Sequence, residues 1–374
     1  MFPLRLPALC LCALLLVLCR PACGDDNKEV AEFKPRGGGM FFAAGISNDG
    51  KLVLTGEDNG FVTLWSVTSG TSVHNYVGHA RSVIGAALLP DGKRGVTCGD
   101  DNLVIVWDLA TGKRLHEMHT GDVTPLAMSC TQDGALAATG CDDGEIIIWD
   151  LAEGRRITTL RRGTPICGLL FSPNSKVLAA GYSDGHVILW NTSDWSEKQT
   201  LASTDGASVG ALGFSMDSRL LATGDQNGAG FIWNVADGTQ LSHFAGYANP
   251  EAAPSPPVSA VFPGSTITPD NRGSIVYVCL SPDGSTVFAS IQDGPPRFWE
   301  TKTGRFLGTA DWFVDPRAED TRFYVARYGF NFAAAAVTPR RNFIVTLRGN
   351  MDDNPEDHRA QVWPMSFVPT PLEQ

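Results

Sequence analysis

A tryptophan recurs at nearly constant spacing along this chain of 374 residues. Each of these tryptophans ends a short run of residues typical of a β-strand, and the seven are Trp65, Trp107, Trp149, Trp190, Trp233, Trp299 and Trp363. The spacings between them are 42, 42, 41, 43, 66 and 64 residues. A period in this range indicates one structural unit that occurs seven times, and such units bury a continuous core only by stacking on their neighbours.

A tight turn has a fixed place in each unit. Sixteen residues before each of the first six tryptophans stands a turn residue, namely Asp49, Asp91, Asp133, Asn174, Asp217 and Asp283. Pairs such as Asp91-Gly92 favour the positive-φ geometry of short hairpins. Because short apolar runs separate the turns, each unit is predicted to contain four antiparallel strands. One such sheet cannot bury both of its faces alone, so the sequence predicts an all-β fold, a seven-bladed β-propeller of four-stranded antiparallel blades.

Two of the units resemble the core of a WD40 repeat, at residues 99–108 and 141–150, and Gly78-His79 resembles the Gly-His pair that opens such a repeat. In that family a His, a Ser or Thr, an Asp and the Trp can form a hydrogen-bonded network inside the blade. The resemblance implies this network in the second unit, which has all four residue types, at His79, Thr97, Asp101 and Trp107. These residues are structural in the family, so no catalytic residue is predicted from them.

The last unit is completed in an unusual way. After Trp363 the chain carries Pro364, Pro369 and Pro371, which make a poor strand. Residues 29–33 instead resemble the outer-strand segment 114–118 of the second unit. We therefore predict that the N-terminal segment supplies the outer strand of blade 7 and closes the propeller, which would span 25–366 and leave a tail at 367–374.

The first 24 residues resemble a signal peptide. Arg5 precedes an apolar stretch from Ala8 to Cys19, which is too short to cross a bilayer comfortably. Ala22-Cys23-Gly24 then offers small residues for cleavage before Asp25. The prediction is an extracytoplasmic protein, secreted or periplasmic, with no membrane span after signal removal. Retention of the segment as an anchor stays open.

Five cysteines remain after that segment, at Cys98, Cys130, Cys141, Cys167 and Cys279. Their number is odd, and their spacing matches neither a disulfide framework nor a zinc site. We predict five buried thiols that act as small apolar side chains. A single disulfide among them stays open, as does glycosylation at the acceptor pattern Asn191-Thr192-Ser193.

The two long spacings place extra residues on one face. Compared with a repeat of 42 residues, the sixth unit has 24 extra residues before its first strand, at about 247–273. The seventh unit has 15 before its first strand, at about 310–324, and 7 between its second and third strands, at about 349–360. Because antiparallel strands alternate in direction, all three insertions must leave the propeller on the same side. Insertions on one side of a repeat protein frequently form its binding surface.

The insertions and their flanks contain aromatic residues and arginines, the residue types that dominate binding hot spots. We predict a partner-binding set of Phe262, Trp312, Phe313, Arg317, Phe323, Tyr324, Arg327 and Tyr328. The predicted function is a non-catalytic scaffold that binds a protein or peptide on this face of blades 5–7, as a monomer within a complex. The alternative for these side chains is that they pack their own loop onto the disc.

Composition and motifs argue against other classes. A net charge of -11 and a pI near 5.1 disfavour nucleic acid as a partner. The predicted inner strands, such as Ile84–Leu88, carry no charge, so no metal and no cofactor is predicted and an enzyme is disfavoured. His116-Glu117-Met118-His119 is not a metal motif if it forms a strand, because residues three apart point to opposite faces of a sheet. A propeller enzyme, or a small-ligand or metal-binding protein using the same face, remains the alternative.

Overall fold

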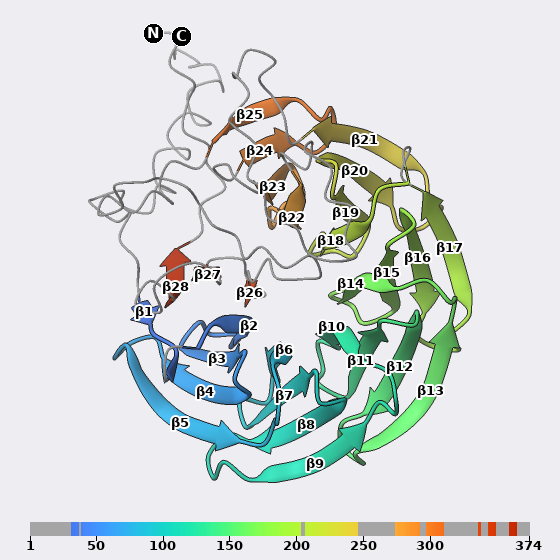
Figure 1. The fold of residues 1–374 in the computed structure, drawn as a ribbon. Coiled ribbons are helices and arrows are strands. Elements are labelled where there is room, and N and C mark those ends of the chain that lie inside the picture. Colours follow the sequence, from blue (N-terminus) through green and yellow to red (C-terminus); the bar gives the residue numbers. More distant parts are fainter. Residues whose placement is uncertain are drawn as a thin grey trace, which may run out of the picture.

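The computed structural model describes residues 31–36, 39–202, 206–245, 274–291, 297–309, 336–337, 343–348 and 359–364. In these ranges the regular elements are β-strands, and they form antiparallel four-stranded sheets (Figure 1). The all-β prediction is confirmed. The predicted signal peptide, the three insertions and the tail lie outside the described residues, apart from the short strands at their margins.

Six sheets each use four consecutive strands of the chain. Sheet 1 contains β2 (Phe41–Ile46), β3 (Leu52–Glu57), β4 (Phe61–Ser66) and β5 (Thr71–Val77). Sheet 2 contains β6 (Val83–Leu88), β7 (Arg94–Gly99), β8 (Leu103–Asp108) and β9 (Arg114–His119). Sheet 3 contains β10 (Pro125–Cys130), β11 (Leu136–Cys141), β12 (Glu145–Asp150) and β13 (Arg155–Arg161).

The next three sheets repeat this order. Sheet 4 contains β14 (Ile166–Phe171), β15 (Val177–Tyr182), β16 (His186–Asn191) and β17 (Glu197–Ala202). Sheet 5 contains β18 (Val209–Phe214), β19 (Leu220–Asp225), β20 (Ala229–Asn234) and β21 (Gln240–Ala245). Sheet 6 contains β22 (Ile275–Leu280), β23 (Thr286–Ile291), β24 (Arg297–Glu300) and β25 (Phe306–Thr309).

A further four-stranded sheet joins distant parts of the chain. It contains β26 (Ala336–Val337), β27 (Phe343–Arg348) and β28 (Arg359–Pro364), and its fourth strand is β1 (Ala31–Phe33). β1 pairs antiparallel with β28, with Ala31 opposite Val362 and Phe33 opposite Ala360. The strand that the sequence placed at residues 29–33 is thus described from Ala31 onward. We call this the terminal sheet.

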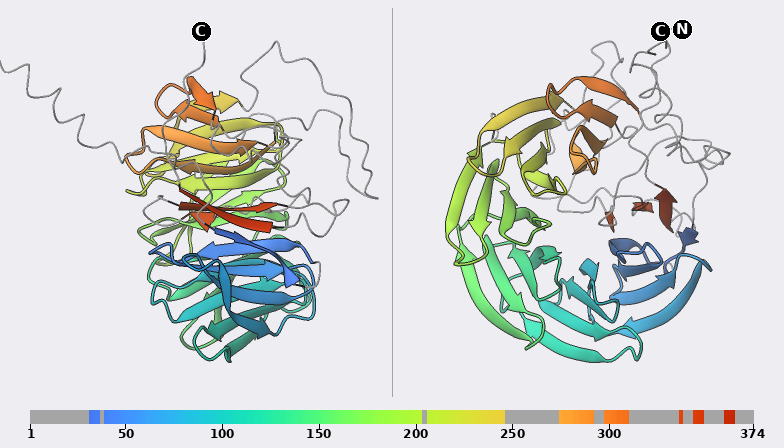
Figure 2. Two further views of the ribbon diagram at one scale, coloured as in Figure 1. Left: turned by 90° about the vertical axis from the view of Figure 1, so that its left-hand side faces the viewer. Right: turned by 180° about the vertical axis from the view of Figure 1, so that it is seen from behind.

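The sheets are arranged around a common centre, with the first strand of each sheet innermost and the fourth outermost (Figures 1 and 2). Successive first strands contact one another from β2 to β22, and β26 and β27 contact β2. The second and third strands are buried on both faces, which requires apolar runs such as Ile146-Ile147-Ile148. The fourth strands expose much of their surface, as the pattern of β5 shows.

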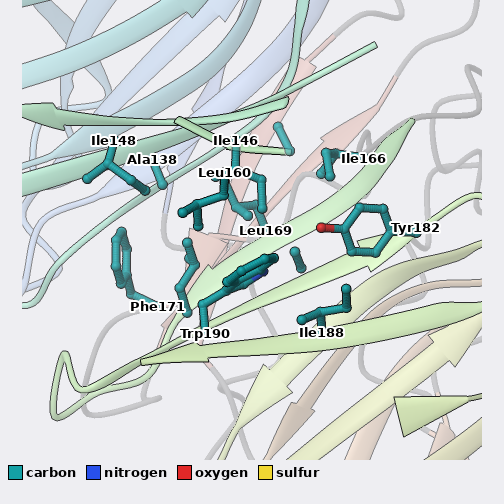
Figure 3. Packing of buried hydrophobic residues seen from close by; sticks show 13 residues of the cluster. Ala138, Ile146, Ile148, Leu160, Ile166, Leu169, Phe171, Tyr182, Ile188 and Trp190 are labelled. Carbon is teal, nitrogen blue, oxygen red and sulfur yellow. The ribbon is translucent and has the colours of Figure 1, made fainter. Parts of the chain in front are cut away.

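One contact between neighbouring sheets recurs at a fixed position. In the fourth strands of sheets 1–5, one residue pairs with the position three residues before the tryptophan of its own sheet. This residue packs in one cluster with the tryptophan of the next sheet. Tyr76 lies 5.4 Å from Trp107, and Phe244 lies 4.9 Å from Trp299, between ring centroids. Leu160 packs in one cluster with Trp190 (Figure 3). Stacking thus buries the apolar faces that a single sheet would leave exposed.

The five cysteines are free thiols, and four of them are buried. The prediction of five buried thiols is therefore wrong for Cys130, which is free but only half-buried. Burial raises the pKa of the Cys141 thiol to about 12, which keeps it protonated and unreactive. The described part of the chain contains no helix long and apolar enough to span a membrane.

Candidate functional site

The first strands of six sheets line a central cavity of about 210 Å³. Its wall carries no charged side chain among the described residues and includes Phe42, Ile84, Leu126, Leu170, Gly210 and Val276. The predicted inner strands therefore do line the centre of the molecule. Without carboxylates or imidazoles on that wall, the described residues offer no ligands for a metal ion there.

A β-bulge recurs in each of these first strands. The register with the second strand shifts between Phe41 and Ala43, and between Val83 and Gly85, with equivalent shifts in the other four sheets. The residue inside each shift stands 23 positions before the tryptophan of its sheet. Bulges redirect side chains, and this one helps to place Phe42 and Ile84 on the cavity wall.

The four network residues of the second unit lie in contact in sheet 2. Trp107 Nε1 donates a hydrogen bond to Thr97 Oγ1 at 2.8 Å, and Thr97 Oγ1 lies 2.8 Å from His79 Nε2. His79 Nδ1 lies 2.9 Å from Asp101 Oδ1. Because the Asp101 carboxylate only accepts, His79 Nδ1–H donates to it, and in this tautomer His79 Nε2 accepts from the Thr97 hydroxyl.

The pKa of Asp101 is set by opposing effects. Burial raises this pKa. The hydrogen bond and charge of His79, together with backbone donors that include Ala80 N, lower it by more than burial raises it, so the pKa lies below its usual value. Asp101 is therefore ionised at neutral pH and orients the His79 ring. The imidazole in turn fills the space beside Gly99, where a Cβ atom would meet His79 Nδ1.

A hydroxyl hydrogen-bonded to an imidazole, which is in turn hydrogen-bonded to a carboxylate, also occurs in hydrolytic triads. Thr97 is fully buried, and its oxygen accepts from Trp107 while its hydroxyl faces His79. No substrate can reach a nucleophile in that position. The arrangement therefore stabilises the sheet and does not perform acyl transfer.

The same Trp–Thr hydrogen bond occurs in sheets that lack a histidine at the position equivalent to His79. Its donors and acceptors are Trp65 and Thr55 at 2.8 Å, Trp149 and Thr139 at 2.9 Å, and Trp233 and Thr223 at 3.0 Å. Sheet 4 has Ala180 at this position, and no hydrogen bond is formed by Trp190 Nε1 within the described residues. The recurrence supports a structural role for the network.

Sheet 1 contains a buried carboxyl group that the sequence did not single out. Glu57 is fully buried, and its Oε2 accepts hydrogen bonds from Arg36 N at 3.0 Å and from Asn59 Nδ2 at 3.3 Å. Burial raises the pKa of Glu57 to about 7, although these hydrogen bonds lower it in part. Glu57 is the last residue of β3, and nothing in the sequence pattern of this strand indicates that its side chain is buried.

The long gaps in the strand order all open on one side. Residues 246–274 separate β21 from β22, residues 310–335 separate β25 from β26, and residues 349–358 separate β27 from β28. Fourth-to-first and second-to-third connections leave an antiparallel sheet on the same side. We call this side the loop face and the opposite side the turn face.

All eight predicted partner-binding residues, from Phe262 to Tyr328, lie outside the described residues. The structure therefore neither brings them together nor separates them. Within the described ranges, no group of three or more His, Cys, Asp or Glu side chains is placed to hold a metal ion. His119 is exposed, whereas His116 is half-buried beside the position of Gly154.

Comparison with known families adds one finding. The model of the WD40 family (WD domain, G-beta repeat) matches residues 70–108, 112–150 and 154–191. These segments span the outer part of sheet 1 through the third strand of sheet 4, and with the repeated four-stranded sheets they fit a WD40 β-propeller. No curated protein matches the chain significantly.

Proposed function

We propose that the chain is an exported, seven-bladed WD40-like propeller that binds a protein or peptide partner through the loop face of blades 5–7. WD40 repeats suggest an interaction scaffold, and three segments of this chain match that family. The terminal sheet would be the seventh blade, closed by β1 against β28. Residues 1–24 would direct export and be removed before Asp25.

The observation that carries the choice of face is the position of the long connections. The described strands bound three gaps far longer than those of sheets 1–4, and all three open on the loop face. On the turn face the connections stay short, and their carboxylates cap their own turns. Asp91 Oδ1, for example, accepts from Lys93 N at 2.8 Å and from Arg94 N at 3.0 Å.

The inner wall supports a scaffold more than an enzyme. Apart from Tyr277, the cavity is lined by small and apolar side chains, and none of the four residues of the sheet 2 network lines it. Binding energy would instead come from aromatic and arginine side chains of the connections, as in other protein interfaces. The sequence supplies such residues at 312–328.

Affinity capture from the native extracytoplasmic compartment tests the proposal. Wild-type chain is compared with Trp312→Ala/Tyr324→Ala, and with Met216→Ala as a control on the turn face, where Met216 is 38% exposed. We expect a partner retained by wild type and by the control and lost with the double variant, while all three melt alike. Equal capture by all three would refute the loop-face site, and a lost melting transition in the double variant would show that the aromatics only pack the loop.

Export has its own test. Mass spectrometry of the chain recovered from the extracytoplasmic compartment should show an N-terminus at Asp25. A chain that stays in the cytoplasm, or that is recovered with residues 1–24 attached to membrane, would contradict a cleaved signal.

A further inference from the structure

We propose that Glu57 is a proton-controlled latch, which holds the segment between β1 and β2 on sheet 1 when neutral and releases it when ionised. This segment connects β1 of the terminal sheet to β2 of sheet 1. Its contacts with sheet 1 therefore help to hold these two sheets together. The inference concerns this junction and does not depend on the loop face or on any partner.

Four hydrogen bonds hold the segment against the end of β3 and the turn between β3 and β4. Glu57 Oε2 accepts from Arg36 N, and Asn59 Nδ2 donates to Arg36 O at 3.2 Å. Met40 N donates to Asp58 Oδ1 at 2.9 Å, and Asp58 N donates to Met40 O at 2.9 Å. Glu57 is the only fully buried ionisable side chain among these contacts.

Comparison with sheet 2 shows why a carboxyl group stands there. Asn59 and Asp101 occupy the same position, six residues before their tryptophans, and Glu57 corresponds to Gly99. In sheet 2 the His79 ring fills the space beside Gly99. The chain between β1 and β2 contains no histidine, and the Glu57 side chain makes the corresponding polar link, to a backbone amide.

The surroundings of Glu57 disfavour its charge. Phe41 of β2 lies opposite Glu57 in register, and Phe41 belongs to a buried apolar cluster that also contains Phe33 and Ala360. Oε1 has no hydrogen-bond partner among the described residues. Of the charged groups, Asp58 raises the pKa of Glu57 and Arg36 lowers it, and burial outweighs both.

The direction of the pH effect follows from the burial of Glu57, because the two hydrogen bonds donated to its Oε2 favour the ionised form and offset burial only in part. A released Glu57 returns to its ordinary pKa of 4.5, whereas the seated carboxyl has a pKa of about 7. The seated state binds the proton more tightly, so seating is strongest in acid and weakens as the pH rises through 7. Between pH 5 and pH 8 the seating equilibrium should change by roughly 50- to 100-fold.

Hydrogen exchange of the full chain measures the latch. Protection factors of residues 31–36, 39 and 40, corrected for intrinsic exchange, are compared between pH 5 and pH 8 in wild type, Glu57→Gln and the outer-strand control Glu117→Gln. We expect wild type and the control to lose about 50- to 100-fold protection in this segment alone, and Glu57→Gln to lose none. Constant protection in wild type, an equal loss in Glu57→Gln, or a loss spread over all sheets would overturn the proposal.

A titration of wild type covers the case in which Glu57→Gln fails to fold. The carbon-13 shift of the Glu57 carboxyl group should report a midpoint near 7. A midpoint near the ordinary value of 4.5 would overturn the latch.

Discussion

Phe33 stacks on Trp65, with ring centroids 5.0 Å apart and planes inclined by 27°. Phe33 belongs to β1 of the terminal sheet, and Trp65 belongs to β4 of sheet 1. The pair has the same register as Tyr76 with Trp107 and Phe244 with Trp299, since each of these residues pairs three positions before the tryptophan of its own sheet. The N-terminal strand thus makes the contact that a fourth strand makes elsewhere.

Phe33→Ala should destabilise the protein by about 3 to 5 kcal/mol, because it removes a fully buried ring and leaves a cavity against Trp65. Urea unfolding measures the change. Val77→Ala, at a residue 74% exposed on another outer strand, should cost little. A loss for Phe33→Ala no larger than for this control would mean that β1 contributes nothing to the fold.

Thr97→Val should cost more than Thr55→Val. In sheet 2 the change removes the acceptor of Trp107 and the partner of His79 Nε2, whereas in sheet 1 Trp65 loses its acceptor and no histidine is affected. Buried unsatisfied groups predict losses of about 2 to 4 kcal/mol and about 1 to 2 kcal/mol, respectively. Chemical denaturation of both variants checks the order, and equal losses would show that His79 adds nothing.

Asp101→Asn should destabilise by about 1 to 3 kcal/mol at pH 7, since His79 and Ala80 N lose a charged acceptor. The pKa of Asp101 is lowered in the fold, so its contribution is present above the ordinary value of 3.8 and is lost as the pH falls through the lower folded value. Wild type and variant should therefore converge in acid. Asp143→Asn, at the equivalent turn of sheet 3, is the control, and parallel pH curves for wild type and Asp101→Asn would contradict the assignment.

Trp195 and Thr158 should behave as a coupled pair. Gly112 and Gly154, five residues after their tryptophans, adopt positive φ and face His74 and His116 of the preceding sheet. Sheet 4 has Trp195 there, at φ 60°, and the preceding sheet has Thr158 in place of the histidine. The small and large residues have therefore exchanged places.

Trp195→Gly and Thr158→His should each cost about 1 to 2 kcal/mol, through lost packing and through overcrowding, respectively. The double variant should recover most of the loss, giving a coupling energy above about 1 kcal/mol in a double-mutant cycle. Additive losses would show that the two positions do not share one space.

The sequence predicted the features that repeat. Trp65, Trp107 and their equivalents predicted the number and positions of the sheets, because each lies near the end of a third strand. Asp91-Gly92 predicted a hairpin, because only certain residues suit its geometry. The four residues of the sheet 2 network were found in the same way, from positions that recur in register. Residues 29–33 were found by their likeness to an outer strand.

The features that depend on segments distant in the sequence were missed. Glu57 has the sequence context of an ordinary residue at a strand end, since its hydrogen bond comes from a segment that returns from another sheet. The stacking of Phe33 on Trp65 depends on β1 pairing with β28 across almost the whole chain. Local pattern carries no information on such distant neighbours, and for the same reason the partner-binding set stays a prediction.

The pairing of β1 with β28 also has a consequence for the order of folding. Ala31 pairs with Val362, so this contact closes a loop of about 330 residues. Sheets 1–6 each use consecutive segments and can form as the chain is synthesised, whereas the terminal sheet must wait until its last strand has emerged. Until then Trp65 lacks the ring that covers it. We therefore expect the newly made chain to expose the face of sheet 1 that carries Trp65 until the terminal sheet has formed, and this face to be vulnerable to proteases and aggregation during that time.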